Sequence, residues 1–473
     1  MKRTDEFEIK LDAPDGFVLP ELPGTAIEPR TFTSTYYDTP DFRLARARIT
    51  LRRRVEHGAS LWQLKLPQGD ERLELEVAGP PGEPPNELTD LVVAVCRGRR
   101  LDEIAELRTR RSGVRVDLGG GPAADVTIDD VSVMDSRRVE QTFSEVEIER
   151  LDGRTRDVRR IAKRLRRAGA VPGESEPKLF RLLVLAEDPV KTGTGPIGLE
   201  HVRAYLRAQY DEILANDPRI RVGGDADAVH DMRVAARRSR ALLRVLRARL
   251  EREWGDSLRA DLKWLGQELG TVRDLDVFGQ RLADDAESLD ADRRGVARLA
   301  KRVERDSRAA RAKLLERLAS DRYFALLDSL ESAVESPRVL DPDVDVVRVA
   351  RKSFNKVRRL VSDLGDSPSD EALHELRIKA KRARYAAELA EPAAGRKARR
   401  FVSAAKAFQD VAGAHQDAVV AEERLRESVA EKPDNELALA VGRLIERQRA
   451  QRKRARAELP RAWRKVQKRA LKS

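Results

Sequence analysis

The sequence of 473 residues is poor in the residue types on which several common protein classes depend. Cys96 is its one cysteine, so no disulfide can form within the chain. No apolar run approaches the length of a bilayer span, and the first residues lack the apolar core of a signal peptide. These absences predict a soluble cytoplasmic protein that is not embedded in a membrane.

Histidines, aromatic residues and phosphate-binding glycine loops are also scarce. The chain has five histidines, and no Ser–His or Cys–His arrangement typical of nucleophilic catalysis stands out. A Gly-x-x-x-x-Gly-Lys-Ser/Thr loop is absent, so any bound phosphate must be held by side chains. Aromatic residues make up 4% of the chain and do not interleave its basic segments, which argues against nucleic acid as a base-stacking partner.

Charged residues, by contrast, are plentiful and unevenly distributed. The chain has 93 Lys and Arg and 81 Asp and Glu, a net charge of +12. Residues 1–190 contain 32 basic and 35 acidic residues, a net of −3, which leaves 61 basic and 46 acidic residues, a net of +15, in 191–473. The second part is therefore predicted to bind a polyanion. Charge alone leaves nucleic acid, an anionic membrane and inorganic polyphosphate open.

Residues 1 to about 185 alternate charged and apolar side chains with the period of two that is typical of β-strands. The alternating segments are 6–10, 48–55, 62–66, 72–77, 114–118, 125–129 and 145–149. Two arrangements fit this pattern. The apolar faces meet in a core and the charged faces point to water, or the sheet closes around a charged lumen and helices cover its apolar outside. Residues 86–98 and 156–168 have the spacing of such covering helices.

The charges separate by strand, which favours the charged lumen. One set of strands is basic and carries Arg48, Arg52, Arg54 and Lys65, and the other is acidic and carries Glu6, Glu8, Glu145, Glu147 and Glu149. Like charges two residues apart in a strand repel unless a counter-ion bridges them. Across a lumen, the two sets would form a basic wall for phosphates and an acidic wall for hard divalent cations.

This part of the chain resembles the CYTH or triphosphate tunnel metalloenzyme superfamily. The matching blocks are Glu6-x-Glu8-x-Lys10, 36–40 with 52–54, 62–65, 145–149 and 177–178. The resemblance implies an eight-stranded antiparallel β tunnel with flanking helices that binds triphosphates with a divalent metal. Adenylyl cyclase chemistry also occurs in this superfamily, but the sequence shows no adenine-sized aromatic pocket.

The resemblance also implies roles for individual residues. Glu6, Glu8 and Lys10 would be essential to catalysis. Mg²⁺ or Mn²⁺ would be bound by Glu6, Glu8, Glu147 and Glu149, with Asp129 and Glu145 as further metal candidates. Phosphate oxygens would be held by Lys10, Arg52, Arg54, Lys65, Lys178 and one of Arg110 and Arg111.

Residues 187–196 are rich in Pro, Gly and Thr and are predicted to link a domain at 1–186 to a second one at 197–473. The second domain has a helical pattern and an internal repeat, about 197–335 and 340–473. The motif His-x-x-Arg-x-x-x-Arg/Lys-Arg-x-Arg stands at 230–240 and again at 374–384, an offset of 144. Lys263, Gly270 and Asp274 recur as Lys406, Gly413 and Asp417, an offset of 143. A helix with such a column of like charges is destabilised unless a polyanion relieves the repulsion.

The second part resembles the CHAD domain, a helical family that binds inorganic polyphosphate. The resemblance implies two helical bundles related by a pseudo-two-fold axis, with basic helices facing a shared channel. The residues placed there are His230, Arg233, Arg237, Arg238, Arg240, Lys263, Arg273, His374, Arg377, Lys381, Arg382, Arg384 and Lys406. The second copy departs from the first at Gln416, which stands where the first copy has Arg273.

The sequence therefore predicts a multidomain α+β protein of the CYTH–CHAD type. The expected activity is metal-dependent hydrolysis of inorganic triphosphate or short polyphosphate. The helical domain would bind long-chain polyphosphate and could place the protein on polyphosphate granules. The main alternative is a polyphosphate-binding protein without catalysis, and a nucleic-acid binder that uses the basic helices is a third hypothesis. Substrate preference, the metal and the oligomeric state stay open.

Overall fold

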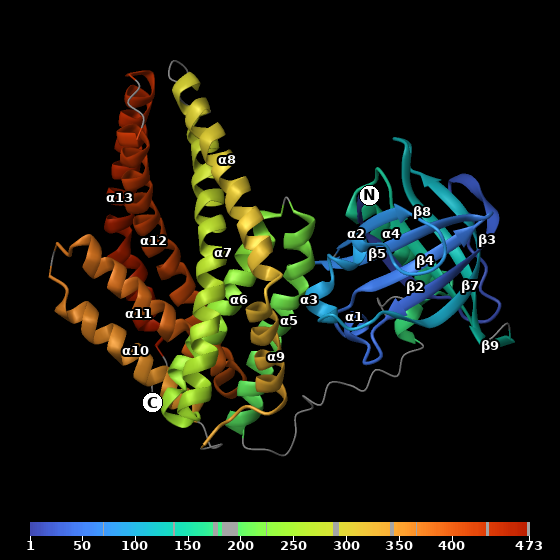
Figure 1. Ribbon diagram of the computed structural model, residues 1–473, viewed down its shortest axis with the longest axis horizontal. Helices are drawn as coiled ribbons and strands as arrows, with labels where there is room; N and C mark the ends of the chain where they lie inside the picture. Colours follow the sequence, from blue (N-terminus) through green and yellow to red (C-terminus); the bar gives the residue numbers. More distant parts are fainter. Residues whose placement is uncertain are drawn as a thin grey trace. The chain divides into compact units, whose positions relative to one another are not determined.

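The computed structural model describes residues 1–470 except 70, 136–137, 174–177, 182–196, 224, 287–292, 341–344, 366 and 432–434 (Figure 1). The chain divides into two compact units, residues 1–189 with 217–223 and residues 190–216 with 224–473, which are called the sheet unit and the helical unit below. The predicted linker at 187–196 lies outside the described residues. None of the helices described combines the length and the hydropathy of a membrane span.

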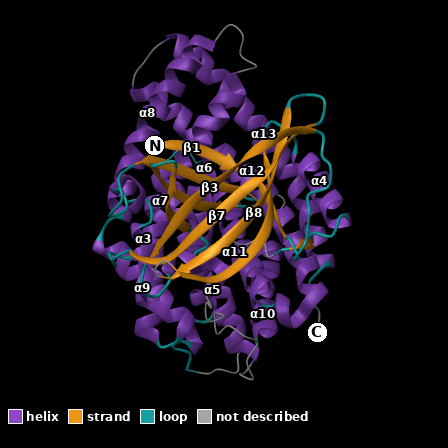
Figure 2. Ribbon diagram, turned by 90° about the vertical axis from the view of Figure 1, so that its right-hand side faces the viewer, coloured by secondary structure: helices purple, strands orange, loops and turns teal. Residues whose placement is uncertain are grey.

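The sheet unit is built on one antiparallel ten-stranded sheet (Figure 2). Its strands are β1 (Lys2–Glu6), β2 (Glu8–Asp12), β3 (Gly24–Asp38), β4 (Thr50–Glu56), β5 (Ala59–Gln68), β6 (Glu71–Ala78), β7 (Asp102–Asp117), β8 (Pro122–Asp135), β9 (Arg138–Arg150) and β10 (Val171–Pro172). Their order is β1-β6-β5-β4-β3-β7-β8-β9-β2-β10. The predicted strand segments lie in this sheet except at some of their ends. Arg48, which was expected in a basic strand, stands instead in a turn before β4 with a φ of 57°.

The two ends of the sheet meet along the first residues of the chain. β1 pairs with β6, which puts Glu6 opposite Arg72, and β2 pairs with β9, which puts Glu8 opposite Glu149. Glu6 and Glu8 are two residues apart, a span of about 7 Å in extended chain, so the sheet must curl around until its ends adjoin. No ladder between described residues joins β1 to β2 directly, so the sheet is a curled sheet and not a closed barrel.

The expected number of eight strands is wrong, and Phe7 is the main reason. The Phe7 carbonyl accepts a hydrogen bond of 2.9 Å from the Arg150 amide of β9, so the chain changes its partner strand at this residue. One N-terminal strand is thereby divided into β1 and β2. The two-residue β10, which pairs with β2, is the second addition.

Helices cover the apolar outside of the sheet, as the arrangement with a charged lumen requires. The helices of this unit are α1 (Arg43–Arg46), α2 (Asn86–Thr89), α3 (Val93–Cys96), α4 (Thr155–Arg167) and the 3₁₀ turn η1 (Lys178–Arg181). Leu88 and Val95 pack against Trp62 and Leu75 of β5 and β6, whereas Ile161 of α4 lies in a second apolar cluster over β2, β8 and β9.

The helix predicted at 156–168 is α4. The helix predicted at 86–98 is instead the pair α2 and α3, because the chain leaves helical geometry at Val92.

The helical unit contains α5 (Ile197–Val222) up to residue 216, and residues 217–222 of this helix belong to the sheet unit. The other helices of the helical unit are α6 (Ala226–Val245), η2 (Arg247–Arg249), α7 (Arg252–Ala286), α8 (Arg293–Leu318), α9 (Asp321–Glu335), α10 (Val346–Asp363), α11 (Asp370–Leu389), α12 (Glu391–Glu431) and α13 (Asn435–Lys468). The bounds of α11 are those of α6 moved by 144 residues, in agreement with the predicted duplication. Within α12 the backbone leaves helical geometry at Gly395, 143 residues after the first residue of α7. α6 and α11, which carry the repeated motif, pack against each other.

Candidate functional site

Three carboxylates meet on the inner face of the curled sheet. Asp129 of β8 and Glu145 of β9 lie opposite each other in the ladder, and Glu147 follows on the same face of β9. One oxygen of each lies within 4.8 Å of the other two, and Asp129 and Glu145 are fully buried. Such oxygen ligands suit a hard divalent cation.

Three cations balance this carboxylate cluster. Lys10 Nζ lies 2.6 Å from Glu147 Oε1, and Lys178 Nζ lies 3.3 Å from Glu145 Oε1. Arg111 Nε donates to Asp129 Oδ1 at 2.7 Å. Arg111 also pairs with Glu147, and Lys178 with Asp129.

The pKa shifts in this cluster show how strongly these charges are coupled. Burial raises the pKa of Glu147, but Lys10, Lys178 and Arg111 outweigh it and hold the pKa well below its usual value. Burial lowers the pKa of Lys10, but Glu147, Glu8 and Glu145 hold it well above its usual value. Burial instead raises the pKa of Glu145, although Lys10 and Lys178 oppose that shift. Phosphate or metal must therefore compete with ion pairs that already exist between these side chains.

A second acidic group lies where the sheet ends meet. Lys65 Nζ of β5 lies 2.6 Å from Glu6 Oε2 of β1, and Glu8 faces Glu149 across the β2–β9 ladder. Burial, followed by the charge of Glu6, raises the pKa of Glu149 to about 7. Burial likewise raises the pKa of Glu6 despite Lys65. Burial raises the pKa of Glu8 less than Lys10, 3.5 Å away, and Lys65 lower it, so Glu8 differs from Glu6 and Glu149 in the direction of its pKa shift.

The basic side chains of β4 point to the same inner face. Arg52 Nε donates to Gln63 Oε1 at 2.8 Å, and Arg52 Nη1 donates to the Tyr36 hydroxyl at 3.3 Å. Arg54 lies over the Phe32 ring, 3.9 Å from its centre. Burial lowers the pKa of Arg52, but neighbouring groups that include Glu147 raise it above its usual value. β3, β7 and β8 separate β4 from β9 in the strand order, so this interaction crosses the lumen.

The structure distinguishes between the two arginines that the sequence left as alternatives. Arg111 points inward to Asp129, whereas Arg110 is exposed. Three inward groups were not among the predicted site residues, namely Gln63, Glu74 and Glu76. Gln63 donates to Glu76 Oε1 at 2.8 Å, and Glu74 Oε1 lies 3.8 Å from Lys65 Nζ. Their place in the alternating strands was the signal that could have found them.

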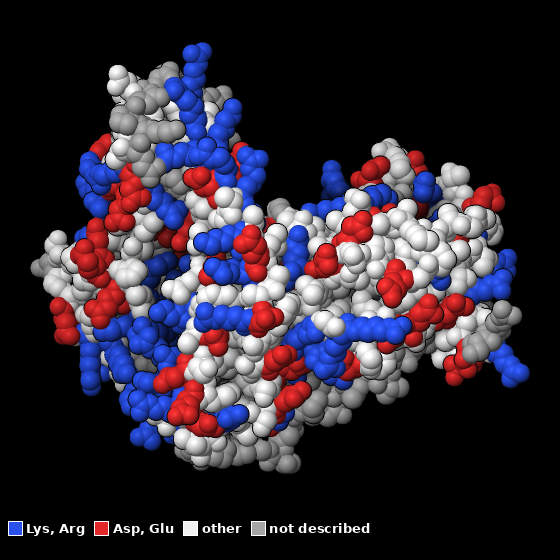
Figure 3. All heavy atoms as spheres, in the orientation of Figure 1, with Lys and Arg blue, Asp and Glu red and all other residues white. Residues whose placement is uncertain are grey.

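In the helical unit, each repeat pairs an arginine of the motif with an aspartate of the next helix. Arg233 Nη1 of α6 lies 3.2 Å from Asp274 Oδ1 of α7, and Arg377 Nη2 of α11 lies 3.9 Å from Asp417 Oδ1 of α12. These pairs are equivalent at the offsets of the repeat. On the visible face of the helical unit, Lys and Arg side chains gather in the region where α7 and α11 are drawn (Figure 3).

The motif histidines lie near equivalent positions in the two repeats. His374 Nδ1 lies 2.8 Å from Gln416 Oε1. Burial and then the charge of Arg273, the residue equivalent to Gln416, lower the pKa of His230. Arg273 and Gln416 therefore occupy the same place with different charge, and this is a physical difference between the halves.

The α6–α11 contact gathers several predicted residues and sets others apart. Arg237 Nε donates to the Tyr385 hydroxyl at 2.8 Å, and burial with Arg237 and Arg377 lowers the pKa of Lys381 to about 7. Arg238 and Arg384 both pair with Glu388, at 3.4 Å and 3.0 Å. The remaining predicted residues lie elsewhere. Arg240 and Lys263 line a separate pocket, Arg382 lies near Arg240, and Lys406 is exposed without an ion pair to the described residues.

Each repeat also contributes an arginine that donates to a carbonyl of the other repeat, an arrangement called the exchange of arginines below. The sequence did not single out these two arginines. Arg281 Nη1 of α7 donates to the Asp417 carbonyl at 2.8 Å, and Arg424 Nη1 of α12 donates to the Asp274 carbonyl at 2.6 Å. Arg281 and Arg424 are 143 residues apart, so each repeat holds the aspartate of the other through an equivalent contact.

Family models and relatives match nearly the whole chain. The CYTH domain model matches residues 5–180 and the CHAD domain model matches residues 204–426. Two uncharacterised proteins of Mycobacterium tuberculosis, MT2285 of strain CDC 1551 and Rv2226 of strain H37Rv, are each 32% identical over 506 residues, which cover 98% of this chain and 96% of theirs.

Solved structures are similar to parts of the chain. PptA from Streptomyces chartreusis is 21% identical, with a TM-score of 0.48, and the match covers 57% of this chain and 99% of PptA. The CHAD domain from the plant Ricinus communis is 27% identical, with a TM-score of 0.47, and the match covers 58% of this chain and 92% of that domain.

Proposed function

The chain belongs to the family of proteins that join a CYTH domain to a CHAD domain, and on that premise we propose that it hydrolyses inorganic triphosphate or short polyphosphate. The reaction takes place inside the curled sheet and uses Mg²⁺ or Mn²⁺. The helical unit binds inorganic polyphosphate through the basic faces of α6 and α11.

One observation carries the proposal for the sheet unit. Side chains of both signs converge on one inner face from strands that are not neighbours in the sheet, as Arg52 with Glu147 and Lys65 with Glu6 show. A plain solvent-exposed face would not bring these groups together. A triphosphate and its metal need cations for the phosphate oxygens and carboxylates for the metal in the same small space.

The carboxylates present fit a hard metal. Asp129, Glu145 and Glu147 offer oxygens at mutual distances within 4.8 Å. Glu6, Glu8 and Glu149 offer further carboxylates nearby. Mg²⁺ and Mn²⁺ favour such all-oxygen ligand sets. A bound divalent cation would neutralise phosphate oxygens and lower the pKa of a coordinated water.

The cations of the chain bind and orient the substrate. Lys10 and Lys65 keep their protons because nearby carboxylates raise their pKa values against the effect of burial. Arg52 is held in place by Gln63 and Tyr36 before any phosphate arrives. Positioned cations of this kind stabilise the charge that develops on the phosphate oxygens during phosphoryl transfer.

The test is phosphate release from tripolyphosphate by the full chain with Mg²⁺ or Mn²⁺. Glu147→Gln and Glu8→Gln should each lower the rate about a hundredfold, the usual size of losing a group that stabilises the transition state. Asp130→Asn is the matched control, since Asp130 adjoins Asp129 in β8 but is exposed. No release by the wild type, or equal release by Glu8→Gln, would refute hydrolysis in the sheet unit.

A second candidate function is anion binding without catalysis, and one observation favours it. Lys10, Lys178 and Arg111 already pair with the three clustered carboxylates. A site in which these pairs persist would bind phosphate without metal. Tripolyphosphate that binds equally with and without Mg²⁺, and is not cleaved, would support this candidate.

A further inference from the structure

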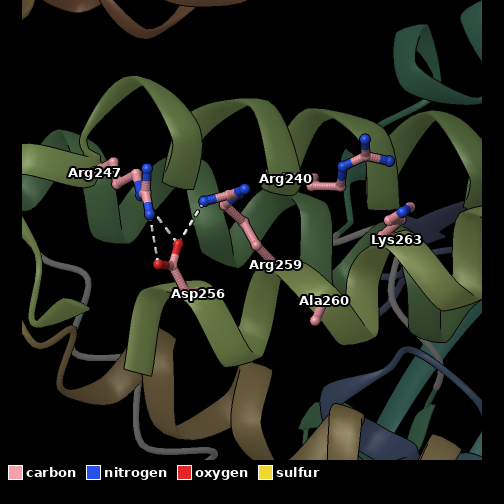
Figure 4. Close-up of a pocket in the computed structure, with 6 residues that line it drawn as sticks. All are labelled: Arg240, Arg247, Asp256, Arg259, Ala260 and Lys263. Carbon is pink, nitrogen blue, oxygen red and sulfur yellow. Dashed lines mark hydrogen bonds and ion pairs between the residues drawn. The ribbon is translucent and has the colours of Figure 1, made fainter. Parts of the chain in front are cut away.

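A second cluster of basic side chains in the helical unit lines a pocket formed by α6, η2 and α7 (Figure 4). The pocket has a volume of about 360 Å³ and is lined by Arg240, Arg247, Asp256, Arg259, Ala260 and Lys263. Four cations and one carboxylate give this lining a net charge of +3. The volume is large enough for a few phosphate groups but not for a folded partner.

The single carboxylate orients two of the cations. Arg247 Nη2 lies 2.8 Å from Asp256 Oδ2, and Arg259 Nη1 lies 2.5 Å from Asp256 Oδ1. Figure 4 shows both guanidinium groups turned towards Asp256. A guanidinium held in this way can offer its remaining N–H groups to a second anion with little loss of side-chain freedom.

The other two cations have no carboxylate of their own. Among the described residues, no ion pair joins Arg240 or Lys263 to an acidic side chain, and in Figure 4 no dashed line reaches either of them. Burial, followed by the charges of Arg259 and Arg244, lowers the pKa of Arg240. Arg382 of α11 also lies close to Arg240 and Arg244. This excess of positive charge is what an anion would relieve.

The second repeat does not reproduce this pocket. At the offsets of the repeat, Arg240 and Lys263 have the counterparts Arg384 and Lys406, but Arg259 is replaced by Val402. Arg244 is replaced by Glu388, which pairs with Arg384 at 3.0 Å. The counterpart of Arg240 is thus already neutralised within its own helix. Arg247 also has the acidic counterpart Glu391, and Asp256 has the basic counterpart Arg399, so four equivalent positions differ in charge between the copies.

We propose that the Arg240–Arg247–Arg259–Lys263 pocket binds phosphate groups of a linear polyphosphate chain, and that it is a subsite of the first repeat without an equivalent in the second. The proposal rests on the polyphosphate binding proposed above for the helical unit. Its consequence is that the two halves hold a chain unequally.

The experiment measures binding of long-chain polyphosphate to the full chain at fixed salt. Arg259→Gln should weaken binding about tenfold, the effect of losing one charge-assisted hydrogen bond pair. Asp256→Asn should strengthen it, because Arg247 and Arg259 lose their competing carboxylate. Arg399→Gln is the matched control, since Arg399 is exposed and stands where the second repeat aligns with Asp256, and it should change binding about twofold or less.

The opposite signs expected for Arg259→Gln and Asp256→Asn separate binding from damage to the fold. If both variants weaken binding equally, the Asp256 cluster is structural and the pocket proposal fails. Equal effects of Arg259→Gln and Arg399→Gln would also overturn it, while leaving polyphosphate binding by the unit intact. A wild type that binds no polyphosphate would overturn both proposals.

Discussion

At the scale of single residues, the charge state of Lys381 depends on burial and on the arginines around it. Lys381 lies on α11 among Arg237, Arg377 and Arg233, with Asp417 as the nearby acid, and its pKa is lowered to about 7 by burial and these arginines. An ordinary lysine keeps its proton to about pH 10. Near neutral pH, Lys381 is therefore only partly charged, and a bound polyanion would restore its proton.

We predict that Lys381 makes stability depend on pH. Because its folded-state pKa lies below the unfolded value, the unfolded chain binds more protons between about pH 7 and 10, and the free energy of unfolding rises with pH in that window. Lys381→Met should remove this rise, as denaturant unfolding at several pH values would show. The surrounding arginines keep their charge over this range. A rise of the same size in the Lys381→Met variant would contradict the assignment.

At the scale of elements, the helical unit joins its two repeats by an exchange of arginines. Arg281 of α7 bonds the Asp417 carbonyl of α12, and Arg424 of α12 bonds the Asp274 carbonyl of α7. The side chains of the same aspartates pair with Arg377 and Arg233. Arg233 and Arg377 of the repeated motif are thus each positioned through a residue that the opposite repeat holds.

We predict that breaking this exchange destabilises the helical unit. Arg424→Met should lower the free energy of unfolding by about 1–3 kcal/mol, because a carbonyl loses a hydrogen bond from a charged donor. Arg426→Met is the control, since Arg426 is exposed on the same helix and its buried partner Glu422, 2.7 Å away, keeps Arg449 at 3.1 Å, and it should cost about 0.5 kcal/mol or less. Urea unfolding with circular dichroism measures both. Equal losses would show that the exchange adds nothing beyond an ordinary surface pair.

At the scale of the whole molecule, the proposed hydrolysis and the proposed polyphosphate binding belong to different compact units. The carboxylate cluster lies in the sheet unit and the repeated basic motif in the helical unit. Substitutions in one should therefore leave the activity of the other in place.

We predict that Glu147→Gln, expected to lower the rate of tripolyphosphate hydrolysis about a hundredfold, binds long-chain polyphosphate with the affinity of the wild type. Filter binding at one salt concentration, with RNA as competitor, is the measurement. RNA should compete poorly, because aromatic residues for base stacking are few in the chain. A Glu147→Gln variant that loses polyphosphate binding would place that binding in the sheet unit instead.

Much of this architecture follows from patterns that the sequence displays. Alternation identified the strands and the inward side chains of β4 and β9, and the repeated motif identified α6 and α11 with their shared offset. The division at Phe7 could not be predicted, because it depends on where the N-terminal strand changes its partner. Nor could the choice between Arg110 and Arg111, which depends on the register of β7.

The ion pairs between the inward side chains could not be foreseen from the sequence. Lys10 was expected to bind phosphate, yet its ammonium group pairs with the Glu147 carboxylate. The two residues lie opposite each other because β2 and β9 are neighbouring strands. Arg238 of α6 reaches Glu388 of α11 because the two helices pack together, whereas the pair of Arg384 with Glu388 lies within α11. Such contacts depend on distances between elements far apart in the sequence, which a local pattern does not encode.

The place of β2 beside β9 has a consequence for synthesis on the ribosome. The first strand residues to emerge from the exit tunnel must wait for about 140 further residues before their partner strand exists. Until then Glu8 and Lys10 have no neighbour on that side, and the nascent domain stays unfinished along its most highly charged edge. Long-range pairing of this kind slows folding, so the charged interior of the sheet would be among the last parts of the unit to form.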